Sequence, residues 1–252
     1  MIYQLTPDIY RLQIPFSNIY TCIFLIRTPE GTVAYDTATY ATDISDYLVP
    51  ALEELGLGKP CAVVISHNHG DHAGGLVAFH DYFPDASIYA GSEACGERVN
   101  KPVHVLTDGE KHWGVLKAVH IPGHTADAFG IYDERTKSLV SGDCLQAYGI
   151  YGKGKWGSNI GYPFEYLDAL SRLEAMDIQN LYAAHHYEPY GNEALHSENV
   201  KNYIRKCRQA LTDIEAYVAT HPGQTPEELA EAYAKETGLP IVPAKSFAAL
   251  LK

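Results

Sequence analysis

Residues 61–72 read Cys-Ala-Val-Val-Ile-Ser-His-Asn-His-Gly-Asp-His. The first five are wholly apolar, which predicts a short strand buried on both faces, as in layered α/β proteins. Three imidazoles and one carboxylate then follow within six residues, and the turn that leaves a buried strand can direct them into one cleft. Imidazole nitrogens and carboxylate oxygens are ligands for Zn²⁺, Fe²⁺ or Mn²⁺. The stretch therefore predicts an α/β fold with a metal site at the end of a strand.

The flanking sequence extends this pattern of strands and helices. Before the stretch, residues rich in β-branched and aromatic types predict a meander of strands at 9–14, 19–27 and 32–35, which ends at Asp36. Apolar residues at helical spacing predict a helix over 43–55. Further strands are predicted at 87–90, 103–106, 116–121, 128–132, 137–141 and 181–184, with a helix after Pro163. From Ser197 the pattern is helical, so we predict a catalytic domain at 1–196 and a helical C-terminal extension at 197–252.

The composition of the chain indicates which class of partner it binds and in which cellular compartment it is found. The chain has 252 residues, with 19 Lys and Arg against 31 Asp and Glu, a formal charge of −12. Such a surface repels phosphate backbones, so we expect a small-molecule substrate and no nucleic acid. The five cysteines include no CxxC pair, which favours free thiols in the cytoplasm. No apolar run is long enough for a membrane span and no signal peptide is recognisable, so no membrane association is expected.

The HxHxDH pattern at 67–72 resembles the signature of the metallo-β-lactamase superfamily. Three further segments match that family in order: Pro122-Gly123-His124-Thr125, Ser141-Gly142-Asp143 and Ala184-His185. Asp36 resembles the family's early structural aspartate. The resemblance covers about residues 8–195 and implies a four-layer αββα sandwich, with the metal site at one edge between the two sheets.

Carried over to these positions, the resemblance implies a dinuclear site. One metal is expected on His67, His69 and His124 and a second on Asp71, His72 and His185, with Asp143 bridging the two. We expect Zn²⁺, with Fe or Mn as alternatives, and we expect Asp71 also to steer the nucleophile or accept its proton. Asp36 is expected to hold the outer N–H of a ligand imidazole. The neighbour of His185, His186, is an open alternative for the last ligand, because adjacent residues on an extended segment face opposite ways.

The implied reaction is hydrolysis by a hydroxide shared between two metals. An ester-like bond is expected as the target, with a thioester or lactone favoured, in a small metabolite that is anionic if Lys153 and Lys155 contact it. Tyr148 and Trp156, in the same Gly-rich loop, are the other candidate substrate contacts. The alternatives are a mononuclear-iron dioxygenase of the persulfide dioxygenase type, a β-lactam hydrolase and a phosphodiester hydrolase. The sequence leaves open whether the helical extension covers the cleft or forms a homodimer.

Overall fold

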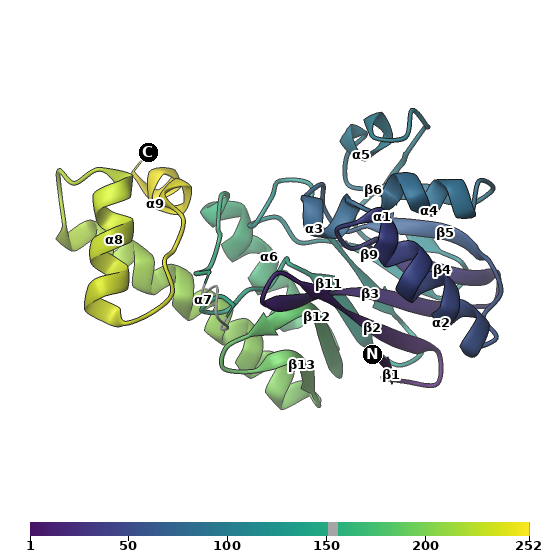
Figure 1. Cartoon of the computed structure of the whole chain (residues 1–252). Coiled ribbons are helices and arrows are strands. Elements are labelled where there is room, and N and C mark those ends of the chain that lie inside the picture. Colours follow the sequence, from purple (N-terminus) through teal and green to yellow (C-terminus); the bar gives the residue numbers. More distant parts are fainter. Residues whose placement is uncertain (151–155, 252) are drawn as a thin grey trace.

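The computed structural model describes residues 1–150 and 156–251, in which two sheets pack face to face (Figure 1). The first sheet has seven strands in chain order, antiparallel from β1 to β4 and parallel from β4 to β7. These strands are β1 (Ile2–Gln4), β2 (Ile9–Phe16), β3 (Ile19–Thr28), β4 (Gly31–Tyr35), β5 (Pro60–Ile65), β6 (Ser87–Ala90) and β7 (His104–Val105).

The second sheet has six strands in the order β13-β12-β11-β10-β9-β8, and only its β11–β12 pair is parallel. These strands are β8 (Lys111–His112), β9 (Leu116–His120), β10 (Phe129–Asp133), β11 (Ser138–Gly142), β12 (Asn180–Tyr187) and β13 (Gly191–Leu195). Together the two sheets account for every predicted strand.

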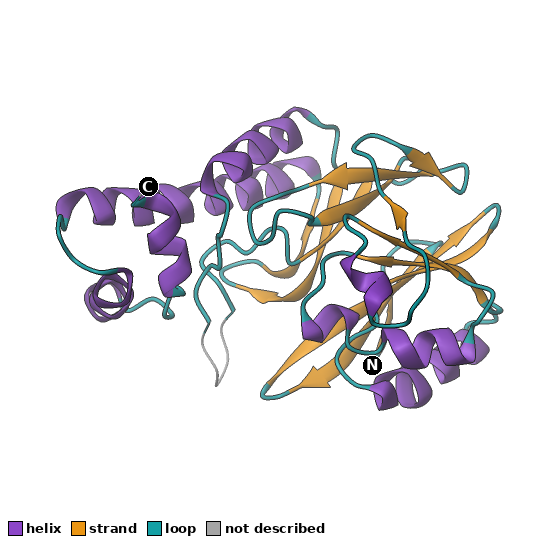
Figure 2. Cartoon of the chain, turned by 90° about the horizontal axis from the view of Figure 1, so that it is seen from above, coloured by secondary structure: helices purple, strands orange, loops and turns teal. Residues whose placement is uncertain are grey.

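Helices cover the outer faces of both sheets (Figure 2). On the first sheet these elements are α1 (Ala41–Asp43), the π-helix η1 (Ile44–Leu48), α2 (Val49–Glu54), α3 (Gly70–Ala73) and α4 (Leu76–Tyr82), with α5 (Ala94–Glu97) beyond β6. The second sheet is covered by α6 (Pro163–Ala175) and the first half of α7 (Ser197–Thr220). The predicted α/β sandwich with helices on both outer faces is therefore confirmed.

Strand β5 lies in the first sheet with both faces buried. Val63 and Ile65 pack against η1, α2 and α4, whereas Ala62 and Val64 face the second sheet. All four are at most 1% exposed. Because neither face meets water, the strand contains no polar position, which explains its unbroken apolar run.

The helix predicted over 43–55 is divided in the structure. It consists of α1, the π-helix η1 and α2, and Pro50 lies in the first turn of α2. Proline has no backbone N–H to donate to the carbonyl four residues earlier, so a regular α-helix cannot pass through this position. A π-helical turn before the proline accommodates the mismatch. The short strands β1, β8 and β13 and the helices α3, α4 and α5 were not predicted from the sequence.

The C-terminal residues form a helical cluster at one end of the sandwich (Figure 1, yellow). Helices α8 (Pro226–Thr237) and α9 (Ala244–Leu250) pack on the second half of α7 around a small core that includes Ile214, Tyr233 and Phe247. Since α7 contributes to this core and also to the sandwich, the division at 196/197 stays a prediction. No helix within the described ranges is both long and apolar enough to cross a membrane.

Candidate metal centre

The candidate ligands lie at or near the ends of four strands. His67 and His69 leave β5, while Asp71 and His72 lie on the short helix α3. The remaining three come from the second sheet: His124 after β9, Asp143 directly after β11, and His185 within β12. The two sheets therefore bring together residues that are far apart in the sequence.

Close packing holds α3 in place. A Cβ atom built on Gly74, at the end of α3, would lie 2.1 Å from the carbonyl oxygen of Thr39. Only glycine permits this approach, and the backbone N–H of Gly74 donates to the carbonyl of Ala38 at 3.0 Å. Gly74, two residues after the HxHxDH pattern, is thus required by the packing of the ligand-bearing turn.

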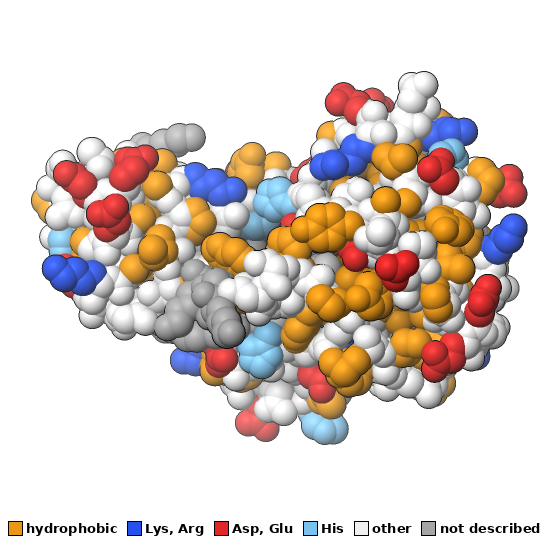
Figure 3. All heavy atoms as spheres, in the orientation of Figure 1, with side chains coloured by type: hydrophobic (Ala, Val, Ile, Leu, Met, Phe, Trp, Pro, Cys, Tyr) orange, Lys and Arg blue, Asp and Glu red, His pale blue; other side chains and the backbone are white. Residues whose placement is uncertain are grey.

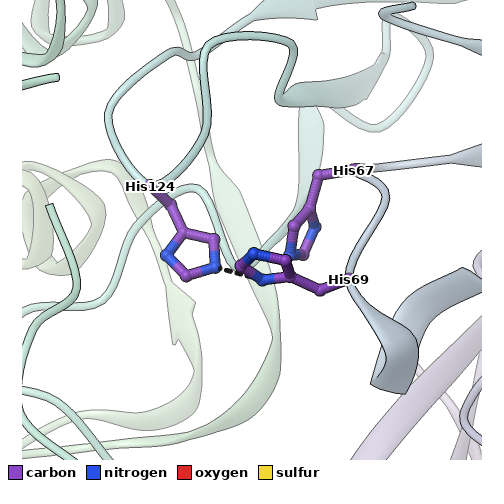
Figure 4. A group of neighbouring side chains, drawn as sticks. All are labelled: His67, His69 and His124. Atoms are coloured by element: carbon purple, nitrogen blue, oxygen red, sulfur yellow. Dashed lines mark hydrogen bonds between the residues drawn. The ribbon is translucent and has the colours of Figure 1, made fainter. Parts of the chain in front are cut away.

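His67, His69 and His124 form the first group of candidate ligands (Figure 4). Their ring centroids lie 4.5 Å (His67–His69), 4.9 Å (His67–His124) and 4.6 Å (His69–His124) apart. Nε2 of His124 is 2.9 Å from Nδ1 of His69. Nε2 of His67 is buried and has no hydrogen-bond partner among the described residues.

The second group contains Asp71, His72, Asp143 and His185. Oδ1 of Asp143 lies 3.3 Å from Nε2 of His72 and 3.3 Å from Nε2 of His185. Oδ2 of Asp71 lies 3.2 Å from Nε2 of His185. Asp143 also approaches the first group, with Oδ2 3.9 Å from Nε2 of His124, so this carboxylate lies between the two groups.

Of the two adjacent histidines, His185 is the one that lies in the cluster. It is fully buried, and its Nδ1 is 2.6 Å from the carbonyl oxygen of Tyr20. The side chain of His186 is 48% exposed and lies 3.4 Å from Glu188. The alternation of side chains along β12 accounts for the difference.

Burial and charge shift the histidine pKa values in opposite directions in the two groups. Burial lowers the pKa of His124 to about 4, and it holds the pKa of His67 well below its usual range. Burial has the same tendency at His185, but the carboxylates of Asp143 and Asp71 overcome it and raise the pKa to about 9. The first group therefore offers neutral nitrogens, and the second combines imidazoles with two carboxylates.

The chemistry of these donors fits two divalent metal ions. A bound metal would satisfy buried imidazole nitrogens that converge in one site and have no hydrogen-bond partner. Nε2 of His67 is such an atom. Carboxylates beside imidazoles give the second group the mixed N and O donors that zinc, iron and manganese accept. The residues therefore support metal binding without selecting the metal.

Asp36 lies behind the second group, fully buried. Its Oδ2 is 2.7 Å from Nδ1 of His72 and accepts a hydrogen bond from the Ser66 hydroxyl at 2.9 Å. Its Oδ1 accepts from the backbone N–H of Ser66 at 2.7 Å. The carboxylate thus orients His72 and fixes the start of the HxHxDH turn.

Two buried residues that were not predicted from the sequence contact the candidate ligands. The Tyr187 hydroxyl donates to Oδ1 of Asp143 at 2.6 Å, and Gln146 lies 3.0 Å from Nδ1 of His124. Tyr187 is two residues from His185 and so on the same face of β12, a spacing that could have revealed it. No local pattern identifies Gln146.

The four predicted substrate contacts differ in their placement. Trp156 is 44% exposed and lines the pocket above the candidate ligands. The Tyr148 hydroxyl instead donates to Asp213 of α7 at 3.3 Å, and Tyr148 is not among the pocket-lining residues. Lys153 and Lys155 lie outside the described residues.

The pocket above the candidate ligands has a volume of about 240 Å³. Its walls combine ligands with apolar side chains and with Pro243, which precedes α9: Phe16, Ile19, His69, Asp71, His124, Asp143, Gln146, Ile150, Trp156, Gly157, Asn159, His185 and Pro243. In Figure 3 a histidine (pale blue) is visible between the C-terminal helices and the sandwich, with basic side chains (blue) on either side. A larger pocket of about 580 Å³ between α2 and α4 contains none of the candidate ligands, so chemistry rather than size identifies the site.

Residues 20–221 match the family model of the metallo-beta-lactamase superfamily, and the chain belongs to that superfamily. Among curated relatives, it is 27% identical over 173 residues to a hydroxyacylglutathione hydrolase from Gloeothece citriformis, covering 66% of this chain and 64% of that protein. It is 30% identical over 179 residues to a beta-lactamase-like protein 2 homolog from Caenorhabditis elegans, covering 68% and 57%. The chain thus spans about six tenths of the length of these relatives.

Solved structures show the same fold. A metallo-beta-lactamase family protein from Thermus thermophilus has a TM-score of 0.70 at 20% identity, covering 98% of this chain and 92% of that one. The rubredoxin oxygen:oxidoreductase of Desulfovibrio gigas has a TM-score of 0.67 at 14% identity, covering 99% and 75%. At these identities the likeness extends to the fold alone.

Proposed function

We propose that this chain is a metal-dependent hydrolase that cleaves an ester-like bond, with a thioester or lactone favoured, in a small anionic acyl compound. The observation that carries the proposal is the pair of adjacent ligand groups, with Asp143 between them, in one pocket. The similarity to a protein named hydroxyacylglutathione hydrolase supports a thioester as the target. Zn²⁺ is the favoured metal, and the free cysteines favour the cytoplasm as the compartment.

His67, His69 and His124 would hold one metal, and Asp71, His72 and His185 the other, with Asp143 between them. Bound divalent metals supply Lewis acidity, which acidifies water and polarises a substrate carbonyl. The carboxylate of Asp71 lines the pocket. Burial favours its neutral form, but His72 and His185 keep its pKa below the usual value. Asp71 therefore stays ionised at neutral pH and can accept a proton from the attacking water at Oδ2.

The rest of the pocket selects the substrate. Phe16, Ile19, Ile150 and Trp156 form apolar walls that exclude water from the acyl group. Drug-sized ligands occupy pockets of about 300–1,000 Å³, so the observed 240 Å³ suits a small acyl group.

Lys245 at the start of α9 is two residues beyond Pro243, which lines this pocket, and it carries a positive charge. Burial is the main cause that lowers the pKa of His69, and the Lys245 ammonium adds to the lowering. Its side chain is exposed, and within the described part of the chain no carboxylate forms an ion pair with it. We therefore propose that the Lys245 ammonium binds the anionic group of the substrate.

Replacement of Lys245 by methionine is expected to raise KM for an anionic substrate by about 3–5-fold, the effect of losing one exposed ion pair. The expected kcat is unchanged, since the charge lies outside the ligand groups. Lys235→Met on α8 is the matched control, because this exposed lysine is on the far helix of the extension. Equal changes in KM for a neutral analogue would contradict the assignment.

The proposed function is tested by metal content and a substrate panel. Protein purified without added metal is analysed for metals per chain and assayed with a thioester, a lactone, a β-lactam and a phosphodiester. We expect two metals per chain and turnover of the thioester or the lactone. One iron per chain, with oxygen uptake and no hydrolysis, would replace the proposal by the dioxygenase alternative.

A further inference from the structure

Gln146 contacts both a candidate metal ligand and the segment that forms one wall of the pocket. It is 6% exposed and lines the pocket. Oε1 accepts a hydrogen bond from the backbone N–H of Asn159 at 2.8 Å, and this contact fixes the orientation of the amide. Nε2 consequently faces Nδ1 of His124, at 3.0 Å.

Nδ1 of His124 has a second neighbour, the carbonyl oxygen of Asn159 at 2.9 Å. The other ring nitrogen, Nε2, faces His69 and so points into the group of three histidines. A neutral imidazole carries one proton. If Nε2 is the nitrogen offered to a metal, Nδ1 carries the proton and can donate it only to Asn159, because the Gln146 amide nitrogen is itself a donor.

The backbone N–H and the backbone carbonyl of Asn159 thus both form hydrogen bonds at the site. Its N–H is held by Gln146 and its carbonyl accepts from His124. We propose that Gln146 is a positioning residue that holds Asn159 where its carbonyl orients His124 for metal binding. The inference depends on the metal-binding part of the proposed function and not on the substrate.

The C-terminal extension also contacts the segment that contains Asn159. The backbone N–H of Ile160 donates to Oγ of Ser246 on α9 at 2.9 Å, and Ser246 is 2% exposed. The N–H of Gly157 donates to the carbonyl of Ile241, also at 2.9 Å. The position of His124 is therefore linked through Asn159 to Gln146 and to α9.

Two substitutions of Gln146 separate this role from simple packing. Gln146→Met fills a similar volume without polar atoms, whereas Gln146→Glu keeps an oxygen for the Asn159 N–H. Zn²⁺ affinity of the full chain is measured by competition with a chromophoric chelator, and circular dichroism verifies the fold. We expect Gln146→Met to weaken one Zn²⁺-binding step by about 10–100-fold, as is usual for partners of metal-bound histidines. Gln146→Glu is expected to restore that step.

Gln209→Met is the matched control, because among the described residues this exposed glutamine on α7 bonds only members of its own helix. Ser246→Ala acts on the same wall from α9 and is expected to weaken the same step by a smaller factor. Wild-type Zn²⁺ affinity in folded Gln146→Met, or equal losses in the Met and Glu variants, would overturn the inference. Should Gln146→Met not fold, wild-type affinity in Ser246→Ala would overturn it. A wild-type chain that binds no Zn²⁺ would instead refute the proposed function.

Discussion

Replacing His69 with alanine is expected to lower kcat/KM by about 10³-fold, equivalent to about 4 kcal/mol of transition-state stabilisation. The imidazole belongs to the group of three histidines, with Nδ1 2.9 Å from Nε2 of His124. Its loss leaves two nitrogen donors, which are too few to hold a catalytic metal firmly.

The same substitution is expected to leave the fold intact. His69 is only partly buried and follows the end of β5, so its ring is not part of either sheet's core. We expect the free energy of unfolding of the metal-free protein to change by less than about 1 kcal/mol. His186→Ala removes an exposed histidine adjacent to a ligand and is the matched control, with activity unchanged. A His69→Ala variant that is active and fully metallated would contradict the site assignment.

Replacing Asp36 with alanine is expected to have the largest effect on stability. The change leaves the Ser66 N–H and the His72 Nδ1–H buried without an acceptor. Removal of one partner from a buried charged pair costs about 3–5 kcal/mol. The backbone adds to the cost, because Asp36 has a φ of 64°, a left-handed conformation that aspartate and asparagine adopt more readily than alanine.

Urea unfolding of the metal-free protein measures this change. Asp36→Asn tolerates the same φ and keeps one acceptor, so its expected loss is smaller than that of Asp36→Ala. Asp85→Ala, on an exposed turn, is the control and should alter stability by less than about 0.5 kcal/mol. A loss in Asp36→Ala no larger than that in Asp85→Ala would refute the role given to this carboxylate.

The strands next to the candidate ligands could be predicted because their signals are local, whereas the four-residue helix α3, which carries Asp71 and His72, was not predicted. The apolar run of β5 and the HxHxDH pattern that follows it are contiguous, and the later matches at His124, Asp143 and His185 each follow a predicted strand. The elements that were missed lack such signals: β8 has two residues, and β13 contains Asn192 and Glu193 within a five-residue strand. Pro50 marks the break in the predicted helix, but its accommodation by a π-helical turn depends on packing against the sheet.

The surroundings of Tyr148 could not be predicted from its place in the sequence. It lies five residues beyond Asp143, and its hydroxyl donates to Asp213 of α7. Gln146, three residues beyond Asp143, is the residue of this segment that reaches the pocket. The direction of each side chain after β11 is set by the irregular turn and by α7, and neither appears in a local pattern.

By itself, the sequence determined the superfamily, the α/β class and the residue types at the candidate metal site, because strand ends and their ligand motifs are short-range features. The tertiary structure alone decided that His185 rather than His186 faces the cluster, that Gln146 and Tyr187 contact ligands, and that α9 forms part of the pocket wall. These features arise from contacts between segments that are 22 to 165 residues apart, such as Gln146 with His124 and His185 with Tyr20. Such contacts form only when the two sheets and the C-terminal helices pack together.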